Sequence, residues 1–403
     1  MKASIQGALL AFAALWAVCA QASLVKAKQI EQPPWQTECI GYHTMQVPGM
    51  VNYAAIAPEH MMPFNPYWEL PSSRAPAWGM DVIPDPSVLD KGDWDKRLIY
   101  LSKPTTPDAL KAIMDKLNAR QEHEKQIILE DAAQWQADKK GDPVGEYAEH
   151  LRQKAAALRF YKPVPGIQAI ADDDGKRTHF YVLLDNQRIV QGLLPSQAAP
   201  AKAIEGFLQH YSTREPFSVP DKPGYCLPYA FYQNGKEMAY NSITFSVSEH
   251  PEIVINLFAG DGSDGGSPPK ESIISVLRNE LADVEEVLPL DGRINPSHAV
   301  TIDGQVGLEH FALVRRKASK PGSKDALDNP YTKDRSDWVY VAATPGIAGS
   351  KPGESFNVVI RIERFGRFAP ESPGKQMAEK QFRDFAKRMV EGIHRRPGAW
   401  AVK

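Results

Sequence analysis

The sequence predicts an α+β protein of two domains, each an antiparallel sheet packed with helices. Short segments of alternating apolar and polar residues, separated by Gly, Asp and Asn, indicate antiparallel strands joined by tight turns. The 33 prolines and 28 glycines indicate many turns and loops rather than a helical bundle. About 380 residues follow the first 22, which exceeds one ordinary core, so we expect domains at 23–215 and 216–403.

The first 22 residues have the pattern of a cleavable export signal. A basic start at Lys2 precedes an uncharged apolar run at 7–20 and the small-residue site Ala20-Gln21-Ala22. The alternative is a membrane anchor, but the run is shorter than the ~20 apolar residues that span a bilayer. A lipid-modified Cys19 is disfavoured by the bulky residues before it. We therefore expect a soluble mature chain, periplasmic in a bacterium.

The expected N-terminal domain contains a sharp change from irregular to helical sequence. Residues 23–103 are rich in Pro, Met and aromatic side chains, which favours short strands and turns. Thr105, Pro107 and Asp108 then supply the cap, first-turn proline and early acid of a helix that ends near residue 140. The other elements expected here are strands at 39–47, 96–101, 167–171, 178–184 and 188–194, and helices at 145–160 and 199–211.

The expected C-terminal domain follows a proline-rich linker at 213–224. Its strand patterns include a hairpin around Asp303-Gly304. The expected strands are 225–232, 241–247, 252–258, 298–302, 307–316, 337–343 and 356–363, and the expected helices are 268–282 and 374–395.

The charge of the chain excludes two classes of partner. The formal net charge is −2, and it becomes −3 when Lys2 leaves with the signal. No basic field is present to hold nucleic acid, and no polybasic segment to hold anionic lipid. We expect neither a nucleic-acid partner nor a stable membrane anchor.

Removal of the signal leaves two cysteines, Cys39 and Cys226. An even pair in an oxidising compartment favours one disulfide over two free thiols. The alternative is a nucleophilic Cys39 with His43 as its base. On a strand over 39–47 these two residues would lie about 13 Å apart, which is too far for that pair. A crosslink over so long a loop stabilises a fold by up to ~5 kcal/mol.

Patterns of catalysis, metal binding and cofactor binding are missing from the sequence. It contains no G-x-S-x-G elbow and no H-E-x-x-H pair. The acidic run 172–174 is typical of a solvated hairpin tip, and the glycine-rich loop 260–267 lacks the spaced acids of a calcium site. We therefore expect no enzyme, no metal and no cofactor.

Four segments occur in an order that resembles a known family. They are Glu38-Cys39-Ile40-Gly41-Tyr42 before Val47-Pro48, then Gly224-Tyr225-Cys226-Leu227, then Asp303-Gly304-Gln305-Val306-Gly307-Leu308-Glu309, and Arg395-Arg396-Pro397-Gly398-Ala399. Together they resemble immunity proteins cognate to type VI secretion phospholipase effectors of the fourth lipase class. The similarity spans most of the mature chain and is weakest at 50–222.

The resemblance implies a periplasmic two-domain protein that binds a toxic lipase and prevents its active site or lid from working. The paired cysteines and the Arg-Pro-Gly-Ala ending match structural features of that family. Tight inhibitors rely on a few aromatic or arginine anchors and on loops. The expected partner-binding residues are therefore Phe64 and Trp68 of the aromatic segment and Asp261 and Asp264 of the loop 260–267, with 317–335 a further candidate loop.

For any single one of these residues, ordinary packing or an ordinary surface loop is the alternative interpretation. Two other functional classes also remain open from the sequence. One is an exported hydrolase with an unrecognised site, and the other is a periplasmic scaffold or carrier of a small ligand.

Overall fold

The computed structural model describes residues 34–55, 58, 61, 81–83, 99–137, 145–173, 177–195, 199–233, 240–263, 265, 268–279, 286–289, 298–316, 335–351, 353–364 and 377–399. The expected export signal lies outside these residues. The expected domain boundary at 215/216 stays a prediction.

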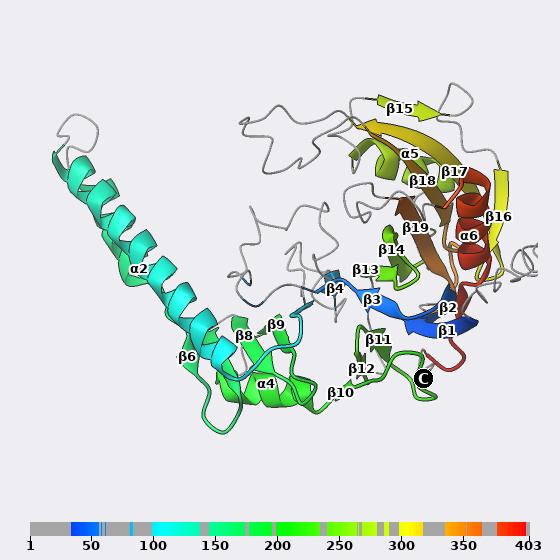
Figure 1. Ribbon diagram of the computed structural model, residues 1–403. Coiled ribbons are helices and arrows are strands. Elements are labelled where there is room, and N and C mark those ends of the chain that lie inside the picture. Colours follow the sequence, from blue (N-terminus) through cyan, green and yellow to red (C-terminus); the bar gives the residue numbers. More distant parts are fainter. Residues whose placement is uncertain are drawn as a thin grey trace, which may run out of the picture. The chain divides into compact units, whose positions relative to one another are not determined.

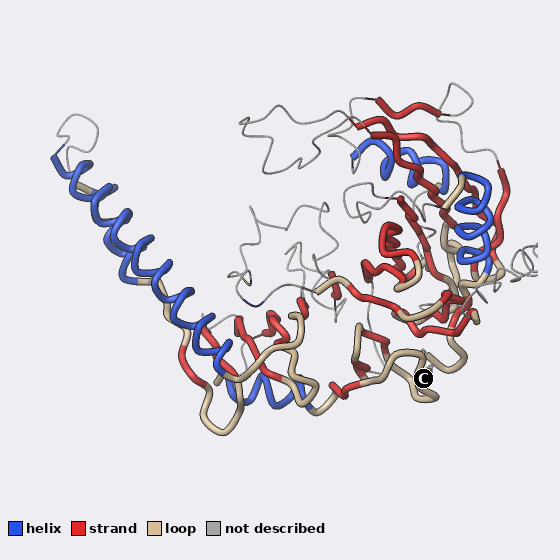
Figure 2. Tube along the Cα trace, in the orientation of Figure 1, coloured by secondary structure: helices blue, strands red, loops and turns tan. Residues whose placement is uncertain are grey.

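The α+β class predicted from the sequence is confirmed, because helices and antiparallel strands occur in both halves of the described chain (Figure 2). None of the helices among the described residues combines the length and the apolar composition that crossing a bilayer requires.

The largest sheet has nine strands in the order β15-β17-β18-β19-β14-β13-β3, with β16 also paired to β17 and β4 to β13 (Figure 1). All of these pairs are antiparallel. The strands are β3 Val51–Tyr53, β4 Asp81–Ile83, β13 Tyr240–Val247, β14 His250–Asp261, β15 Glu286–Pro289, β16 His298–Ile302, β17 Gln305–Arg316, β18 Arg335–Thr344 and β19 Phe356–Arg364.

One face of this sheet carries the main hydrophobic core. Ile255 lies opposite Ile362 and Leu257 opposite Ile360, and all four side chains are fully buried. This alternation is the two-residue period of a strand with one face toward a core. The helix α6 (Glu379–Glu391) packs on the same face, where Phe382 contacts Trp338 and Phe311.

Helix α6 is shorter than the sequence predicts. The expected helix ended at 395, but Gly392 closes α6 and the chain turns away at once. Residues His394–Arg395 then form the short strand β20. The apolar stripe continues to Ile393, which is buried outside the helix. The helical spacing of apolar residues therefore continues past the residue at which the helix ends.

A second sheet has the order β5-β9-β8-β7-β6. The hairpins expected around 173–176 and 185–186 are present in it. Its strands are β5 Ile99–Leu101, β6 Lys162–Pro163, β7 Ala169–Asp173, β8 Arg177–Leu183 and β9 Ile189–Pro195.

Three helices accompany the second sheet. Helix α2 (Asp108–Ala137) starts where the cap pattern predicts, and its first half buries Leu110, Ile113 and Leu117 with the strand residues Ile170 and Tyr181. Its second half packs on α3 (Glu146–Ala156), and α4 (Pro200–Leu208) buries Ile204 and Phe207. Helix α5 (Pro269–Asn279) packs instead against β17 and β18 of the largest sheet.

Two segments expected to be single strands are hairpins. The expected strand 39–47 is β1 (Trp35–Ile40) followed by β2 (His43–Pro48), with Ile40 paired to His43 across a two-residue turn. Gly41 has φ 63° and Tyr42 has no positive φ, as a type II′ turn requires. The prediction of a single strand was wrong because the apolar residues of the two strands form one continuous pattern across the turn.

The expected strand 225–232 is likewise β11 (Tyr225–Leu227) and β12 (Ala230–Tyr232), joined at Pro228 and Tyr229. Tyr229 adopts a positive φ of 55° although it is not glycine. The strand β10 (Tyr211–Thr213) pairs with β12, and β20 pairs with β2. The pairing of β2 with β20 joins segments about 350 residues apart, whereas β10, β11 and β12 are close in the sequence.

Two glycine-to-alanine changes test opposite consequences of this fold. A Cβ atom at Gly307 would lie 2.2 Å from the carbonyl oxygen of Ala343 on the neighbouring strand. Gly206 of α4 has open space around it. We expect Gly307→Ala to lower the free energy of unfolding by about 1–3 kcal/mol, as overpacking does. We expect Gly206→Ala to raise it by about 0.5–1 kcal/mol, because alanine favours a helix interior over glycine.

The measurement is urea unfolding of both variants beside the wild type. A Gly307→Ala variant as stable as the wild type would show that β17 and β18 do not approach as closely as described.

Candidate functional site

A disulfide between Cys39 of β1 and Cys226 of β11 joins residues 187 positions apart. Both cysteines are fully buried, and Phe231 packs with them. Beside the bond, Gly41 and Cys226 exchange two backbone hydrogen bonds of 2.9 Å. The crosslink predicted from the cysteine count is therefore present, and Cys39 is not a free nucleophile.

Arg214 and Glu38 form a buried ion pair next to the disulfide. Arg214 Nη2 lies 2.6 Å from Glu38 Oε1, and the two side chains are 3% and 0% exposed. The same guanidinium donates to the carbonyl oxygens of Cys39 at 3.1 Å and Ser218 at 3.0 Å. Glu38 Oε2 accepts from the backbone N–H of Phe217 at 2.6 Å. Because one such charge buried alone is unfavourable by several kcal/mol, the pair must be buried together.

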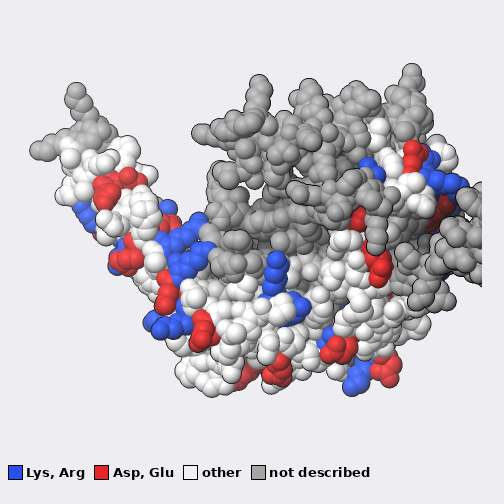
Figure 3. Space-filling view, in the orientation of Figure 1, with Lys and Arg blue, Asp and Glu red and all other residues white. Residues whose placement is uncertain are grey.

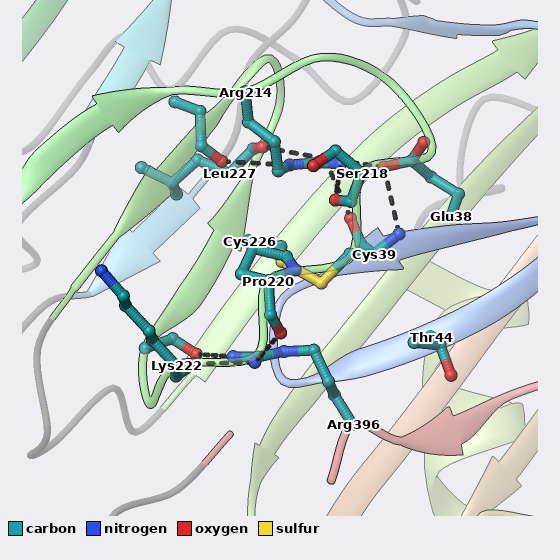
Figure 4. The surroundings of a disulfide bond; sticks show 12 residues. Glu38, Cys39, Thr44, Arg214, Ser218, Pro220, Lys222, Cys226, Leu227 and Arg396 are labelled. Carbon is teal, nitrogen blue, oxygen red and sulfur yellow. Dashed lines mark hydrogen bonds and ion pairs between the residues drawn. A yellow bond between two sulfur atoms is a disulfide. The ribbon is translucent and has the colours of Figure 1, made fainter. Parts of the chain in front are cut away.

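Arg396 lies on the other side of the disulfide, as Figure 4 shows. Its guanidinium donates to the carbonyl oxygens of Pro220 at 2.6 Å, Lys222 at 2.8 Å and Gly224 at 2.5 Å. Its backbone N–H donates to the carbonyl of Tyr42 at 2.8 Å. Arg396 is only 1% exposed and is the largest fully buried side chain of the described residues.

The two arginines hold a segment that has no regular secondary structure. Residues 214–224 make turns and bends only, so their carbonyl groups lack ladder partners. A buried polar group without a partner costs about 1–3 kcal/mol. A guanidinium has five N–H donors and can therefore satisfy several carbonyl groups at once. We call the group of Glu38, Cys39, Arg214, Cys226 and Arg396 the buried joint.

The sequence identified the two cysteines of the buried joint, but it did not indicate Arg214 or the burial of the Arg396 side chain. An arginine beside a proline-rich loop has the same local sequence whether it is solvated or buried. The Arg-Pro-Gly-Ala segment, through its resemblance to the immunity family, is the signal in the sequence that points toward Arg396.

His43 lies in β2 with no exposed surface, edge-on to the ring of Phe356 at 5.0 Å. Neither ring nitrogen has a hydrogen-bond partner among the described residues. Burial lowers the pKa of His43 to about 4; nearby Asp303 opposes this shift and nearby Arg395 adds to it. His43 is therefore a neutral packing residue rather than a general base for Cys39.

Three loops meet at one end of the largest sheet. Asp261 of β14 pairs with Phe356 of β19, and Thr344 ends β18 at the same level. The β16–β17 turn at Asp303 and Gly304 completes this edge. We call this region the loop end; it comprises residues 261–263, 303–306, 345–351, 353–355 and Arg395.

Asp261, an expected partner-binding residue, lies in the loop end and holds its loop together. Its carboxylate accepts hydrogen bonds from the backbone N–H and hydroxyl of Ser263 at 3.2 and 3.0 Å. It also accepts from the N–H of Gly353 at 3.4 Å. Its partner-binding role stays a prediction. Asp264, Phe64 and Trp68 lie outside the described residues, as does most of 317–335.

Arg395 connects the loop end to the buried joint. Its backbone N–H donates to Asp303 Oδ1 at 2.6 Å, and its guanidinium donates to the carbonyl of Gly353 at 3.1 Å. The next residue is Arg396 of the buried joint. Within the part of the chain that the structure describes, no cluster of three or more His, Cys, Asp or Glu could hold a metal ion.

An open depression of about 880 Å³ lies beside the start of α2 and the end of α4. Its volume is within the range of small-molecule sites. Asp185 and Glu205 line it, together with Gln168, Gln187 and Gln209, and its lining contains no Lys, Arg or His. This surface is the candidate site for the ligand-carrier interpretation.

The chain is similar to solved structures of type VI secretion immunity proteins. It matches the immunity protein TplEi of T6SS from Pseudomonas aeruginosa complexed with "L" peptide at 13% identity and a TM-score of 0.46, over 91% of this chain and 100% of that chain. The apo structure of TplEi matches at 13% identity and a TM-score of 0.45, over 90% and 97%. A chain of the Tle4-Tli4 complex matches at 13% identity and a TM-score of 0.45, over 90% and 98%.

No family model matches the chain. No curated protein matches it significantly. Since the structural similarity is distant, we base the functional proposal on this chain's own residues.

The disulfide gives a stability prediction. We expect Cys39→Ser, and the double variant Cys39→Ser with Cys226→Ser, to lose about 2–5 kcal/mol of unfolding free energy, because the unfolded chain is no longer crosslinked. The measurement is thermal unfolding with and without reductant. Reductant should lower the melting temperature of the wild type and leave that of the double variant unchanged. Equal shifts in both would contradict a disulfide in the folded protein.

His43 gives a pH prediction. Its folded pKa of about 4 is below the ordinary 6.5, so the unfolded chain binds more protons between these values. Stability from neutral His43 is complete above pH 6.5 and is lost as the pH falls toward 4, by up to about 3 kcal/mol. His43→Leu should remove this component of the pH dependence in urea unfolding. A wild type and variant with parallel stability curves from pH 7 to 4 would show that folding does not lower the pKa of His43.

Proposed function

We propose that this chain is a periplasmic immunity protein that binds and inhibits a type VI secretion lipase effector and so protects the producing cell. The observation that carries the proposal is the convergence of all four segments that resemble the immunity family. Cys39 of the first is bonded to Cys226 of the second. Arg396 of the fourth contacts Tyr42 and Gly224, and Arg395 contacts Asp303 of the third.

The roles of these segments are consistent with a function that depends on shape. The described residues of the four segments make a disulfide, an ion pair, a buried guanidinium and two tight turns. These features hold a fold together and do not make a reacting centre. A protein that inhibits by occlusion needs a stable surface of about 800 Å² for its partner and no catalytic group of its own.

The expected compartment agrees with the crosslink. A buried disulfide forms and persists in an oxidising environment such as the bacterial periplasm. The expected export signal at 1–22 would deliver the chain there. On the face shown in Figure 3, acidic and basic side chains are interspersed, which suits a protein partner better than nucleic acid.

The test is protection of cells against a periplasmic lipase. The candidate effector is a lipase with a G-x-S-x-G elbow encoded beside this chain. We expect cells that direct this lipase to the periplasm to survive only with the full chain, because the inhibitor must reach the same compartment. A variant without residues 2–22 is the matched control and should not protect. Equal killing with and without the full chain would contradict the proposal for that lipase.

A purified-protein assay separates inhibition from catalysis. One equivalent of the mature chain should abolish lipase activity, and the chain alone should turn over no lipid, sugar or peptide. Turnover that a single polar substitution abolishes in a folded variant would instead support an exported hydrolase. Saturable binding of a small molecule at the depression beside α2 would support a ligand carrier.

A further inference from the structure

Three arginine side chains around helix α6 lie over aromatic rings. The guanidinium carbon of Arg364 is 3.9 Å from the ring centroid of Trp338. Those of Arg383 and Arg388 are each 4.0 Å from a ring centroid, of Phe311 and Trp35 respectively. These distances are well inside the ~6 Å over which a cation is attracted to a ring face. We call these six residues the arginine–aromatic face.

The three stacks belong to one surface because their rings contact two neighbouring side chains of α6. Trp338 and Phe311 both contact Phe382, with ring centroids 5.9 and 6.0 Å apart. Trp35 contacts Phe385, three residues further along α6, at 5.9 Å. Residues three apart lie on the same side of a helix. Because Phe382 and Phe385 are both buried, the arginines lie at the rim of one continuous aromatic cluster.

The acidic side chains of α6 are each paired with a cation of the same helix. The pairs are Arg383 with Glu379 at 3.1 Å, Lys380 with Asp384 at 2.6 Å and Lys387 with Glu391 at 3.8 Å. The fourth cation of α6 is Arg388, which has no acidic partner among the described residues. Helix α6 therefore leaves one positive charge for another molecule.

The stack on Trp35 holds Arg388 in a form suited to binding. Arg388 is exposed, whereas Trp35 is half-buried and packs on Phe385. A guanidinium over a ring contacts it with its flat face, so the N–H donors around its edge stay available. Its position is already restricted, and it loses less conformational entropy on binding than a free side chain does. Arginine and tryptophan are also the residue types most enriched among interface anchors.

We propose that the arginine–aromatic face is the surface by which this chain docks on its effector, with Arg388 as the anchor for an aspartate or glutamate carboxylate. This inference rests on the proposed function. A guanidinium and a carboxylate have matching planar geometry and can form two parallel hydrogen bonds. The occupant is therefore an acidic patch of the effector protein.

The acids of α6 favour a protein over an anionic membrane as the occupant. Asp384 and Glu391 are 67% and 53% exposed on the same helix as Arg388. A continuous layer of lipid phosphates would face these carboxylates as well as Arg388, and like charges facing each other are unfavourable. A protein can place one carboxylate against Arg388 and leave the others without an opposing acid.

The chain offers a matched control on another helix. Arg152 of α3 is 39% exposed and pairs with Glu149, so Arg152→Gln removes the same charge from an exposed helical position outside the proposed surface. The test compares Arg388→Gln, Arg388→Lys and Arg152→Gln. Binding of each mature chain to the purified lipase effector is measured by surface plasmon resonance, and thermal unfolding shows that each variant is folded.

We expect Arg388→Gln to bind about 10- to 100-fold more weakly, as loss of an interface anchor does. Arg388→Lys should recover part of this loss and bind about 3- to 10-fold more weakly than the wild type, because lysine keeps the charge but not the planar fork. Arg152→Gln should bind within about threefold of the wild type, as substitutions outside anchors do.

Salt provides a second readout. The association rate constant of the wild type should fall at least about threefold between 0.05 and 0.5 M NaCl, where exposed charges are largely screened. The fall should be smaller in Arg388→Gln, because this variant lacks the charge that attracts the acidic patch. The same salt dependence in both proteins would contradict a carboxylate partner for Arg388.

Four further results would overturn the inference. Wild-type affinity in Arg388→Gln, or an equal loss in Arg152→Gln, places the contact elsewhere and leaves the proposed function intact. Failure of the wild type to bind the effector removes the proposed function and this surface together. Flotation of the wild type with phosphatidylglycerol vesicles, lost in Arg388→Gln, would show a lipid occupant. A dimer in sedimentation that Arg388→Gln dissociates would show a second copy of this chain.

Discussion

The buried guanidinium groups of Arg214 and Arg396 are the constraint on which the rest of the structure depends. Each satisfies carbonyl groups of residues 214–224 that no strand or helix could satisfy. Glu38 balances one of the two charges inside the protein. Without these bonds the segment would bury unpaired carbonyl groups or open to water. The disulfide adds a covalent link at the same place, so the crosslink and the hydrogen bonds restrain the same two segments.

The buried joint ties together three parts of the chain that are far apart in sequence. The β1–β2 hairpin pairs with β20 near the C-terminus and is bonded through Cys39 to the β11–β12 hairpin. Arg395, adjacent to Arg396, then fixes the turn at Asp303. The disulfide, Arg396 and Arg395 therefore connect the two hairpins to the loop end of the largest sheet through contacts of neighbouring residues.

The partner-binding residues could be predicted only in part. The segment 260–267 was expected to be a surface loop, but its first residues end strand β14, where Asp261 is half-buried. The sequence did not reveal that the Asp261 carboxylate would be engaged with Ser263 and Gly353. It also gave no sign that Val306 and Ile347, which lie outside the expected strands, would be exposed. Exposure depends on which strands become neighbours, and local pattern does not contain that information.

Local physics in the sequence determined most of the strands, the start of α2 and the pairing of the cysteines. Alternation, capping residues and cysteine number act over a few neighbouring residues or follow from the compartment, so they can be recognised without a fold. Tertiary structure decided the turn at Gly41, the end of α6 at Gly392 and the burial of the arginines. Arg214 reaches a carbonyl group 175 residues away, and Arg396 reaches one 172 residues away. Whether a guanidinium finds buried carbonyl groups or water depends on such distant contacts, which exist only once the chain has folded.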